Sequence, residues 1–218
     1  MSHPVGNPGT ADGDPVLDDL DDDDGRELIG CALSAIARAL NGGAPLKATP
    51  EGNTAPTRPR LARHGACFVS LHRGPSLLGC IGTLAAHRPL YLDAAANGVA
   101  AAFADPRLPA IDGDDFESMS VEVSVLGTPM GLDVSSMEEL LGVVRPGVDG
   151  LVVRHRTRRA TLLPSVWERI PDAGDFIDVL WRKAGLPARR WPRGVTVEHY
   201  RTRSFEDPGP RLLPPAGD

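Results

Sequence analysis

The segment at residues 120–126 alternates strictly between polar and apolar residues, and this pattern constrains the fold strongly. Its sequence is Ser-Val-Glu-Val-Ser-Val-Leu. A period of two places the three valines on one face of a strand and Glu122 on the other. The segment is therefore predicted to be a half-buried strand. Glu122 is interpreted as either a solvated strand residue or a cleft carboxylate available as a general base.

Other hydrophobic patterns predict hairpins and helices on both sides of this strand. Helical spacing with start and stop signals predicts helices over 26–40, 89–105, 135–141 and 176–183. Two hairpins are predicted over 66–83 and 151–163, with turns at 73–76 and 155–158, and a last strand over 195–200. This order predicts an α+β fold with mainly antiparallel sheets and flanking helices.

The chain divides into one domain with a tail at each end. Its 218 residues are the length of a single domain or two small, tightly packed ones. Residues 1–25 are rich in Gly, Pro and Asp, and they are predicted to form an acidic, disordered tail. The predicted α+β domain spans 26–206, and the Pro-rich residues 207–218 are predicted to be frayed.

Charge and composition exclude several classes of protein. The net charge of −6 argues against a general nucleic-acid binder, and the basic run at 154–159 is interpreted as a solvated hairpin turn. No apolar stretch approaches the roughly 20 residues that span a membrane, and no secretory leader is recognised. The low cysteine content favours a reducing cytoplasm. Nearly all basic residues are arginine, the lysines being Lys47 and Lys183, which indicates a coding bias.

Standard signatures of cofactor and metal sites are missing from the sequence. There is no GxGxxG, GxxxxGK[ST], HExxH, CxxC or GxSxG pattern, and the six histidines are scattered. The sequence therefore predicts no cofactor and no metal site.

A thiol flanked by two glycines is the most distinctive local feature. Residues 79–82 read Gly-Cys-Ile-Gly, within the second arm of the first hairpin. Glycine inside a strand often marks close approach by a ligand or another chain, so Cys80 is a candidate nucleophile or binding group at the floor of a cleft. In the alternative interpretation Cys80 is a small buried hydrophobe. A four-residue turn pairs Cys80 with Val69 and places it on a wholly apolar face with Cys67.

Asp105 and Arg107 flank a proline at the end of the predicted helix over 89–105. In one interpretation Arg107 pairs with Asp105 or caps the helix carbonyls. In the other, Arg107 supplies a positive charge near the cleft or binds an anionic group.

An ordered set of short motifs runs along about residues 26–206. These motifs are Phe-Val-Ser-Leu at 68–71, Leu-Gly-Cys-Ile-Gly-Thr at 78–83, Ala-Ala-Phe-Ala-Asp-Pro-Arg at 101–107, the strand at 120–126, Gly-Leu-Val at 150–152, Leu-Leu-Pro at 162–164 and Lys-Ala-Gly-Leu at 183–186. In this ordered set the chain resembles the AmmeMemoRadiSam system protein A family, which is built on the AMMECR domain.

The resemblance implies two unequal, interlocked subdomains with a cleft between them. It also implies a three-part system with a Memo-type protein, similar to extradiol dioxygenases, and a radical-SAM protein. The expected role is a substrate-binding or thiol-bearing cleft that contributes to a modification reaction. Cys80 is the candidate catalytic residue, and the candidate substrate-binding residues are Gly79, Ile81, Gly82, Arg107 and Glu122. The competing hypothesis is a non-enzymatic protein-interaction module with a structural Cys80.

One residue departs from the pattern of the family, which usually has arginine where this chain has Leu78. An arginine on the face of Cys80 would favour the thiolate form of the cysteine. Leucine removes that positive charge, and this difference shifts weight towards the structural interpretation of Cys80.

Overall fold

The first of two lobes is built on a four-stranded antiparallel sheet. The computed structural model describes residues 14–43 and 56–215. The strand order in this sheet is β10-β5-β2-β3, and every neighbouring pair is antiparallel. The strands are β2 (Cys67–Arg73), β3 (Ser76–Gly82), β5 (Ser120–Leu126) and β10 (Thr202–Asp207). The strand predicted at 120–126 is therefore confirmed, whereas β10 was not predicted.

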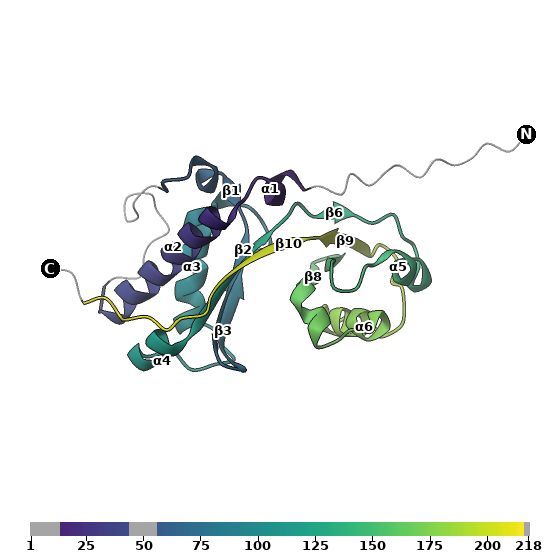
Figure 1. Ribbon diagram of the computed structural model, residues 1–218. Coiled ribbons are helices and arrows are strands. Elements are labelled where there is room, and N and C mark those ends of the chain that lie inside the picture. Colours follow the sequence, from purple (N-terminus) through teal and green to yellow (C-terminus); the bar gives the residue numbers. More distant parts are fainter. Residues whose placement is uncertain (1–13, 44–55, 216–218) are drawn as a thin grey trace, which may run out of the picture.

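Two helices, α2 (Asp22–Leu40) and α3 (Leu90–Phe103), cover one face of this sheet (Figure 1). The valines of β5 point towards the helices and are fully buried, together with Val69 and Leu71 of β2. Glu122 lies on the opposite face of the sheet, which is turned towards the second lobe (Figure 1). The alternation in β5 therefore separates a core face from a face that borders the space between the lobes.

The second lobe packs its longer helix, which is amphipathic, against another four-stranded antiparallel sheet. Its strand order is β6-β9-β7-β8, with α6 packed against β7 and β8. In its core, Trp167 stacks on Phe176 with ring centroids 3.7 Å apart, and Trp181 is fully buried. The elements are β6 (Met130–Gly131), α5 (Met137–Val143), β7 (Gly150–His155), β8 (Arg158–Leu162), a 3₁₀ helix (Pro164–Glu168), α6 (Ala173–Lys183) and β9 (Thr196–Tyr200).

The chain crosses between the lobes twice, from β5 to β6 and from β9 to β10, so the lobes are interlocked (Figure 1). A small apolar cluster that includes Ala66, Leu126, Val152 and Tyr200 joins them. The remaining elements belong to the first lobe: α1 (Pro15–Asp18), a 3₁₀ turn (Pro59–Ala62), β1 (His64–Gly65), β4 (Arg88–Pro89) and α4 (Gly113–Ser118). This architecture confirms the predicted α+β class with mainly antiparallel sheets.

The predicted disorder of the acidic N-terminal segment is wrong for residues 14–25, which include α1 and the first turn of α2. Asp21 caps α2 in a reciprocal capping box with Asp24. The buried Asp24 carboxylate also pairs with Arg58, whose Nε lies 2.5 Å away, and with Arg60. Aspartates at a helix N-terminus interact favourably with the helix dipole, and the arginines balance their mutual repulsion. Residues 1–13 lie outside the described residues.

The expected frayed C-terminus is also wrong between residues 208 and 215. The side chain of Arg211 donates to the backbone oxygen of Met119 over 2.7 Å, and Leu213 packs against the core of the first lobe. These contacts fix the Pro-rich segment although it has no regular secondary structure.

None of the helices in the described residues is both long and apolar enough to cross a bilayer.

Candidate functional site

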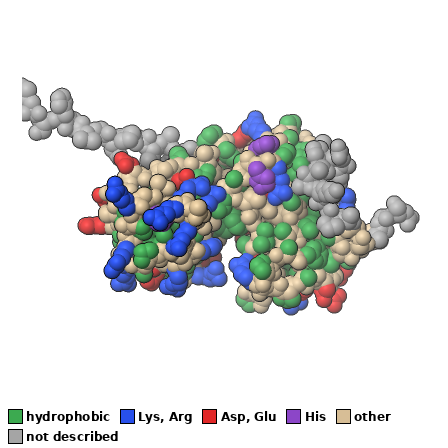
Figure 2. Space-filling model, turned by 180° about the vertical axis from the view of Figure 1, so that it is seen from behind, with side chains coloured by type: hydrophobic (Ala, Val, Ile, Leu, Met, Phe, Trp, Pro, Cys, Tyr) green, Lys and Arg blue, Asp and Glu red, His purple; other side chains and the backbone are tan. Residues whose placement is uncertain are grey.

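A pocket of about 1220 Å³ lies between the two lobes, and candidate residues from the sequence line it. Figure 2 shows a notch between the two halves of the molecule, with Lys and Arg side chains at both rims. The first lobe contributes residues of β2, β3, β5 and β10 and the loop after α3. The second lobe contributes residues 161–171 with Val179 and Lys183. Cys80, Ile81, Gly82, Arg107 and Glu122 line the pocket.

A β-bulge decides which face of the sheet carries Cys80. Next to the turn, Arg73 pairs with Ser76 and His72 with Leu77, in the expected register. The register then shifts, so Cys80 lies opposite Ser70. One extra residue in a strand moves the following side chains to the other face. The predicted pairing of Cys80 with Val69, and its place on the apolar face with Cys67, are therefore wrong.

The thiol of Cys80 has a polar neighbour on the facing strand. The hydroxyl of Ser70 donates to the sulfur of Cys80 over 3.3 Å, and Cys80 is half-buried. Farther along the same row, Ser70 is opposite Glu122 of β5. Cys67 lies on the core face, fully buried and in no disulfide, with its thiol donating to Asp93 over 3.5 Å, and burial raises its pKa well above the usual value. The two cysteines thus have opposite environments within one hairpin.

Asp105 and Arg107 hold the backbone of Cys80 from the loop after α3. The backbone nitrogen of Cys80 donates to Asp105 over 3.0 Å, and Nη2 of Arg107 donates to the backbone oxygen of Cys80 over 3.0 Å. Arg107 also forms a bidentate pair with Asp105, at 2.8 and 2.6 Å. This pairing holds the pKa of the Asp105 carboxyl well below its usual range. Both interpretations of Arg107 therefore describe its position: it pairs with Asp105 and lies beside Cys80.

Glu122 is positioned by a short hydrogen-bonded row of polar side chains. Ser124 donates to Oε1 of Glu122 over 2.6 Å, and its hydroxyl lies 2.8 Å from that of Ser204. Glu122 and Ser204 both line the pocket. The structure thus places this carboxylate on the pocket wall.

Lys183, at the end of α6, is a pocket residue that was not predicted as part of the site. Its ammonium donates to the backbone oxygen of Thr161 over 3.0 Å. Burial, and secondly the positive charge of Arg107, lower the pKa of Lys183, while the charge of Cys80 acts in the opposite direction. Lys183 therefore lines the same pocket as Arg107 and Cys80, from the other lobe. The helical spacing of the sequence placed Lys183 at the end of a helix. It could not show that this end of the helix lines a pocket together with residues of the first lobe.

The glycines around Cys80 serve packing within the chain. Gly79 does not line the pocket, contrary to its expected role in binding substrate. A Cβ at Gly79 would lie 1.9 Å from the backbone oxygen of Ala101, because α3 crosses the strand at this point. A Cβ at Gly82 would lie 2.2 Å from the ring of Phe68. The close approach that the glycines permit is therefore by α3 and by a neighbouring side chain of the same sheet.

Leu78 does not share a face with Cys80 as the sequence predicted. Leu77 lines the pocket, whereas Leu78 packs against the core of the first lobe. The bulge at this point breaks the alternation that would have placed residues 78 and 80 together. Leu78 therefore lies away from the pocket face, where Arg107 is a cation that contacts the backbone oxygen of Cys80.

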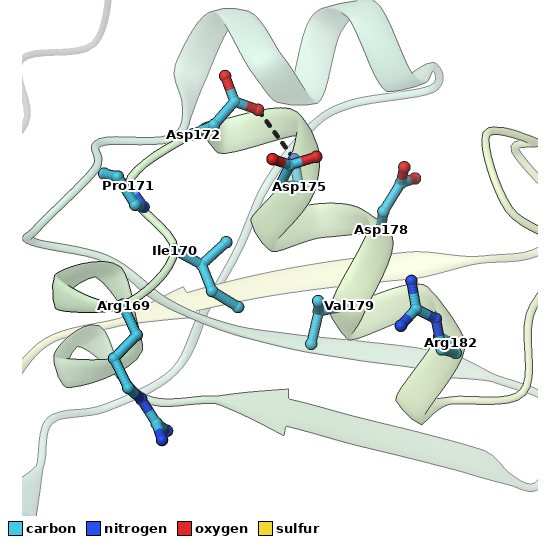
Figure 3. A pocket seen from close by; sticks show the side chains of 8 residues that line it. All are labelled: Arg169, Ile170, Pro171, Asp172, Asp175, Asp178, Val179 and Arg182. Carbon is cyan, nitrogen blue, oxygen red and sulfur yellow. Dashed lines mark hydrogen bonds between the residues drawn. The ribbon is translucent and has the colours of Figure 1, made fainter.

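A second, shallower pocket of about 440 Å³ lies along α6 (Figure 3). Three aspartates of this segment surround it at a spacing of three residues, with Arg169 and Arg182 close by (Figure 3). Asp172 caps the helix, and Asp178 pairs with Arg189 at 3.3 Å. Between residues 14 and 43 and between 56 and 215, no three His, Cys, Asp or Glu side chains are grouped to hold a metal ion.

The comparison with protein families identifies the class of the chain. The AMMECR1 family matches residues 29–205, which is most of the chain, so this protein belongs to the AMMECR1 family. The resemblance inferred from the short motifs is thereby confirmed.

Particular relatives are archaeal. A protein from Methanothermobacter thermautotrophicus is 35% identical over 173 residues, covering 77% of this chain and 85% of the relative. A protein from Aeropyrum pernix is 33% identical over 204 residues, covering 89% and 83%. Among solved structures, an uncharacterised protein from Pyrococcus horikoshii matches with a TM-score of 0.78 and 28% identity, covering 88% of this chain and 96% of that one. The two-lobed fold is therefore shared with a solved structure.

Proposed function

We propose that this AMMECR1 protein contributes the pocket around Cys80 to a modification reaction, and that it acts in the cytoplasm with a Memo-type protein and a radical-SAM enzyme. In this proposal the pocket binds the substrate, and the thiol of Cys80 orients it or bonds to it. The reaction partners are inferred from the family resemblance, whereas the role of the pocket is inferred from its geometry.

The observation that carries the proposal is the position of Cys80 on the pocket face of the sheet. A structural cysteine would be expected on the core face, where Cys67 is fully buried and its thiol contacts the buried Asp93. Cys80 instead lines the pocket beside the Ser70 hydroxyl and Arg107. Positive charges and hydrogen-bond donors near a thiol favour the nucleophilic thiolate form.

The partnership can be tested by purifying the tagged full-length protein from its own cells. We expect both a Memo-type and a radical-SAM protein to copurify with wild type and with Cys80→Ser. We expect Cys80→Ser to abolish the activity of the system in cells while leaving the fold and the retained partners unchanged. Cys31→Ser is the matched control, because Cys31 lies on α2 outside the pocket. Wild-type protein that retains neither partner would contradict the proposed system.

Alkylation separates the proposal from a non-enzymatic interaction module. Iodoacetamide is expected to label Cys80 of the native protein while leaving the buried Cys67 unreacted, as read by peptide mass spectrometry. Labelling of Cys80 only after denaturation, together with full activity of Cys80→Ser, would favour the interaction module with a structural cysteine.

A further inference from the structure

Lys183 stands out among the cations of this protein by its chemical type and its place. The chain has 23 basic residues, and only Lys47 and Lys183 are lysines. Lys183 lines the pocket at the end of α6, with one hydrogen bond to the backbone of Thr161. An ammonium has three donors, and this contact uses one of them. Arg107 and Cys80 line the same pocket from the first lobe.

Arg107 offers spare hydrogen-bond donors from the opposite lobe. Its Nε and Nη2 atoms are occupied by Asp105 and by the backbone of Cys80. Within the described part of the chain, Nη1 makes no hydrogen bond. The Asp105 carboxylate neutralises one positive charge, so the group of Asp105, Arg107 and Lys183 carries a net charge of about +1 with Lys183 protonated. Glu122 and Glu168 also line the pocket, and the Glu122 carboxylate accepts a hydrogen bond from Ser124.

We propose that Arg107 and Lys183 together form an anion-binding subsite beside Cys80, and that the ligand of the pocket carries a carboxylate or phosphate group there. The proposal rests on the pocket being the binding site, as proposed above, and it adds the chemical class of the ligand. Arginine suits both anions, because its planar fork matches their oxygens, and lysine adds a compact charge. Because the two cations come from different lobes, an anion between them also ties the lobes together.

The alkylation of Cys80 by two reagents of similar size tests this subsite without knowledge of the substrate. Iodoacetate carries a carboxylate, whereas iodoacetamide is neutral. For each thiol, the rate constant with iodoacetate is divided by the rate constant with iodoacetamide. We expect this ratio at Cys80 to exceed the ratio for N-acetylcysteine by roughly tenfold, since a focused positive potential raises the local concentration of anions. Arg107→Met and Lys183→Met should each lower this ratio, and Lys183→Arg should retain it. Arg156→Ala, at the exposed β7–β8 turn, is the matched control and should leave the ratio unchanged.

The outcomes distinguish this subsite from the proposed function as a whole. A Cys80 that reacts with both reagents in the ratio of the free thiol would overturn the anion subsite and leave the thiol-bearing pocket in place. The same conclusion follows if neither methionine variant changes the ratio.

A second measurement decides the matter if Cys80 reacts with neither reagent, which would count against the role of its thiol. Acetylation of Lys183 by acetic anhydride is then followed by peptide mass spectrometry, with Lys47 as internal reference. Inorganic phosphate or acetate should slow the modification of Lys183 severalfold relative to chloride at equal ionic strength. If only phosphate or only acetate slows the acetylation of Lys183, the anion that does so shows which group the subsite prefers. Equal rates in all three salts would overturn the subsite.

Discussion

The hydroxyl of Ser70 lies 3.3 Å from the sulfur of Cys80, across the ladder that joins β2 and β3. This contact exists because the strands slip by one residue after their turn, which brings both side chains to the pocket face. The hydroxyl is the donor, so the hydrogen bond is strongest when the sulfur carries a negative charge. The geometry therefore links a local backbone irregularity to the chemistry available at Cys80.

Replacing Ser70 with alanine should slow the alkylation of Cys80 by iodoacetamide at neutral pH. A hydrogen bond to a charged group contributes about 1.5 kcal/mol, which corresponds to a rate reduced by up to about tenfold. The measurement is the second-order rate constant in native protein, read by peptide mass spectrometry. Ser204→Ala is the control, because Ser204 lines the same pocket but contacts Ser124. An unchanged or faster rate in Ser70→Ala would show that the hydroxyl does not support the thiolate.

The strand at 120–126 could be predicted from sequence, whereas the face of Cys80 could not. Alternation of residue type directly reports which side of β5 is buried. In β3, Leu77 and Leu78 are both apolar, so the pattern does not reveal which of them is the extra residue of the bulge. A register shift of one residue reverses every side chain beyond it, and so a single undetected bulge changed the predicted environment of Cys80.

Gly79 should be far more sensitive to substitution than a glycine on an open surface. Gly79→Ala places a Cβ 1.9 Å from the backbone oxygen of Ala101, and α3 has to move to relieve this clash. We expect a loss of about 3 kcal/mol in the free energy of unfolding, measured by urea denaturation. Gly30→Ala, in α2 with nothing within 4 Å, should instead gain about 0.5–1 kcal/mol. Equal effects at the two sites would contradict the close packing of α3 on β3.

The rest of the site could not be predicted from sequence patterns, because it depends on contacts between segments that are distant in the sequence. The spacing of apolar residues in α6 predicts a helix, and it is observed over Ala173–Lys183. It does not say that the last residue of this helix lines the same pocket as Arg107 of the other lobe, 76 positions earlier in the sequence. Such a shared pocket follows only from how two interlocked lobes pack.

Tyr200 should ionise only at strongly alkaline pH, because its ring is buried where the lobes join. Its hydroxyl lies 2.8 Å from that of Thr161, and burial raises the pKa of Tyr200 to about 12. A raised folded pKa contributes stability that is complete below about pH 10 and is lost as the pH rises towards 12. Absorbance at the tyrosinate band isolates this group in Tyr91→Phe, since the chain has two tyrosines. A midpoint near 10 while the protein remains folded would contradict the buried position.

The charged Asp105 carboxyl should add to the free energy of unfolding at neutral pH, and this contribution should be lost in acid. Its pairing with Arg107 lowers the pKa of Asp105, so the folded carboxyl stays charged below about pH 4, where the unfolded one takes up a proton. The stabilisation is therefore present above pH 4 and is lost as the pH falls towards the folded pKa. At pH 7, Asp105→Asn should cost about 2 kcal/mol, less than a fully buried pair because Arg107 is exposed to water. Urea unfolding of the wild type and of Asp105→Asn at several pH values should show the difference between their free energies of unfolding shrinking below pH 4. Asp133→Asn, at an exposed position, should show almost none, and a difference for Asp105→Asn that grew in acid would reverse the assigned sign.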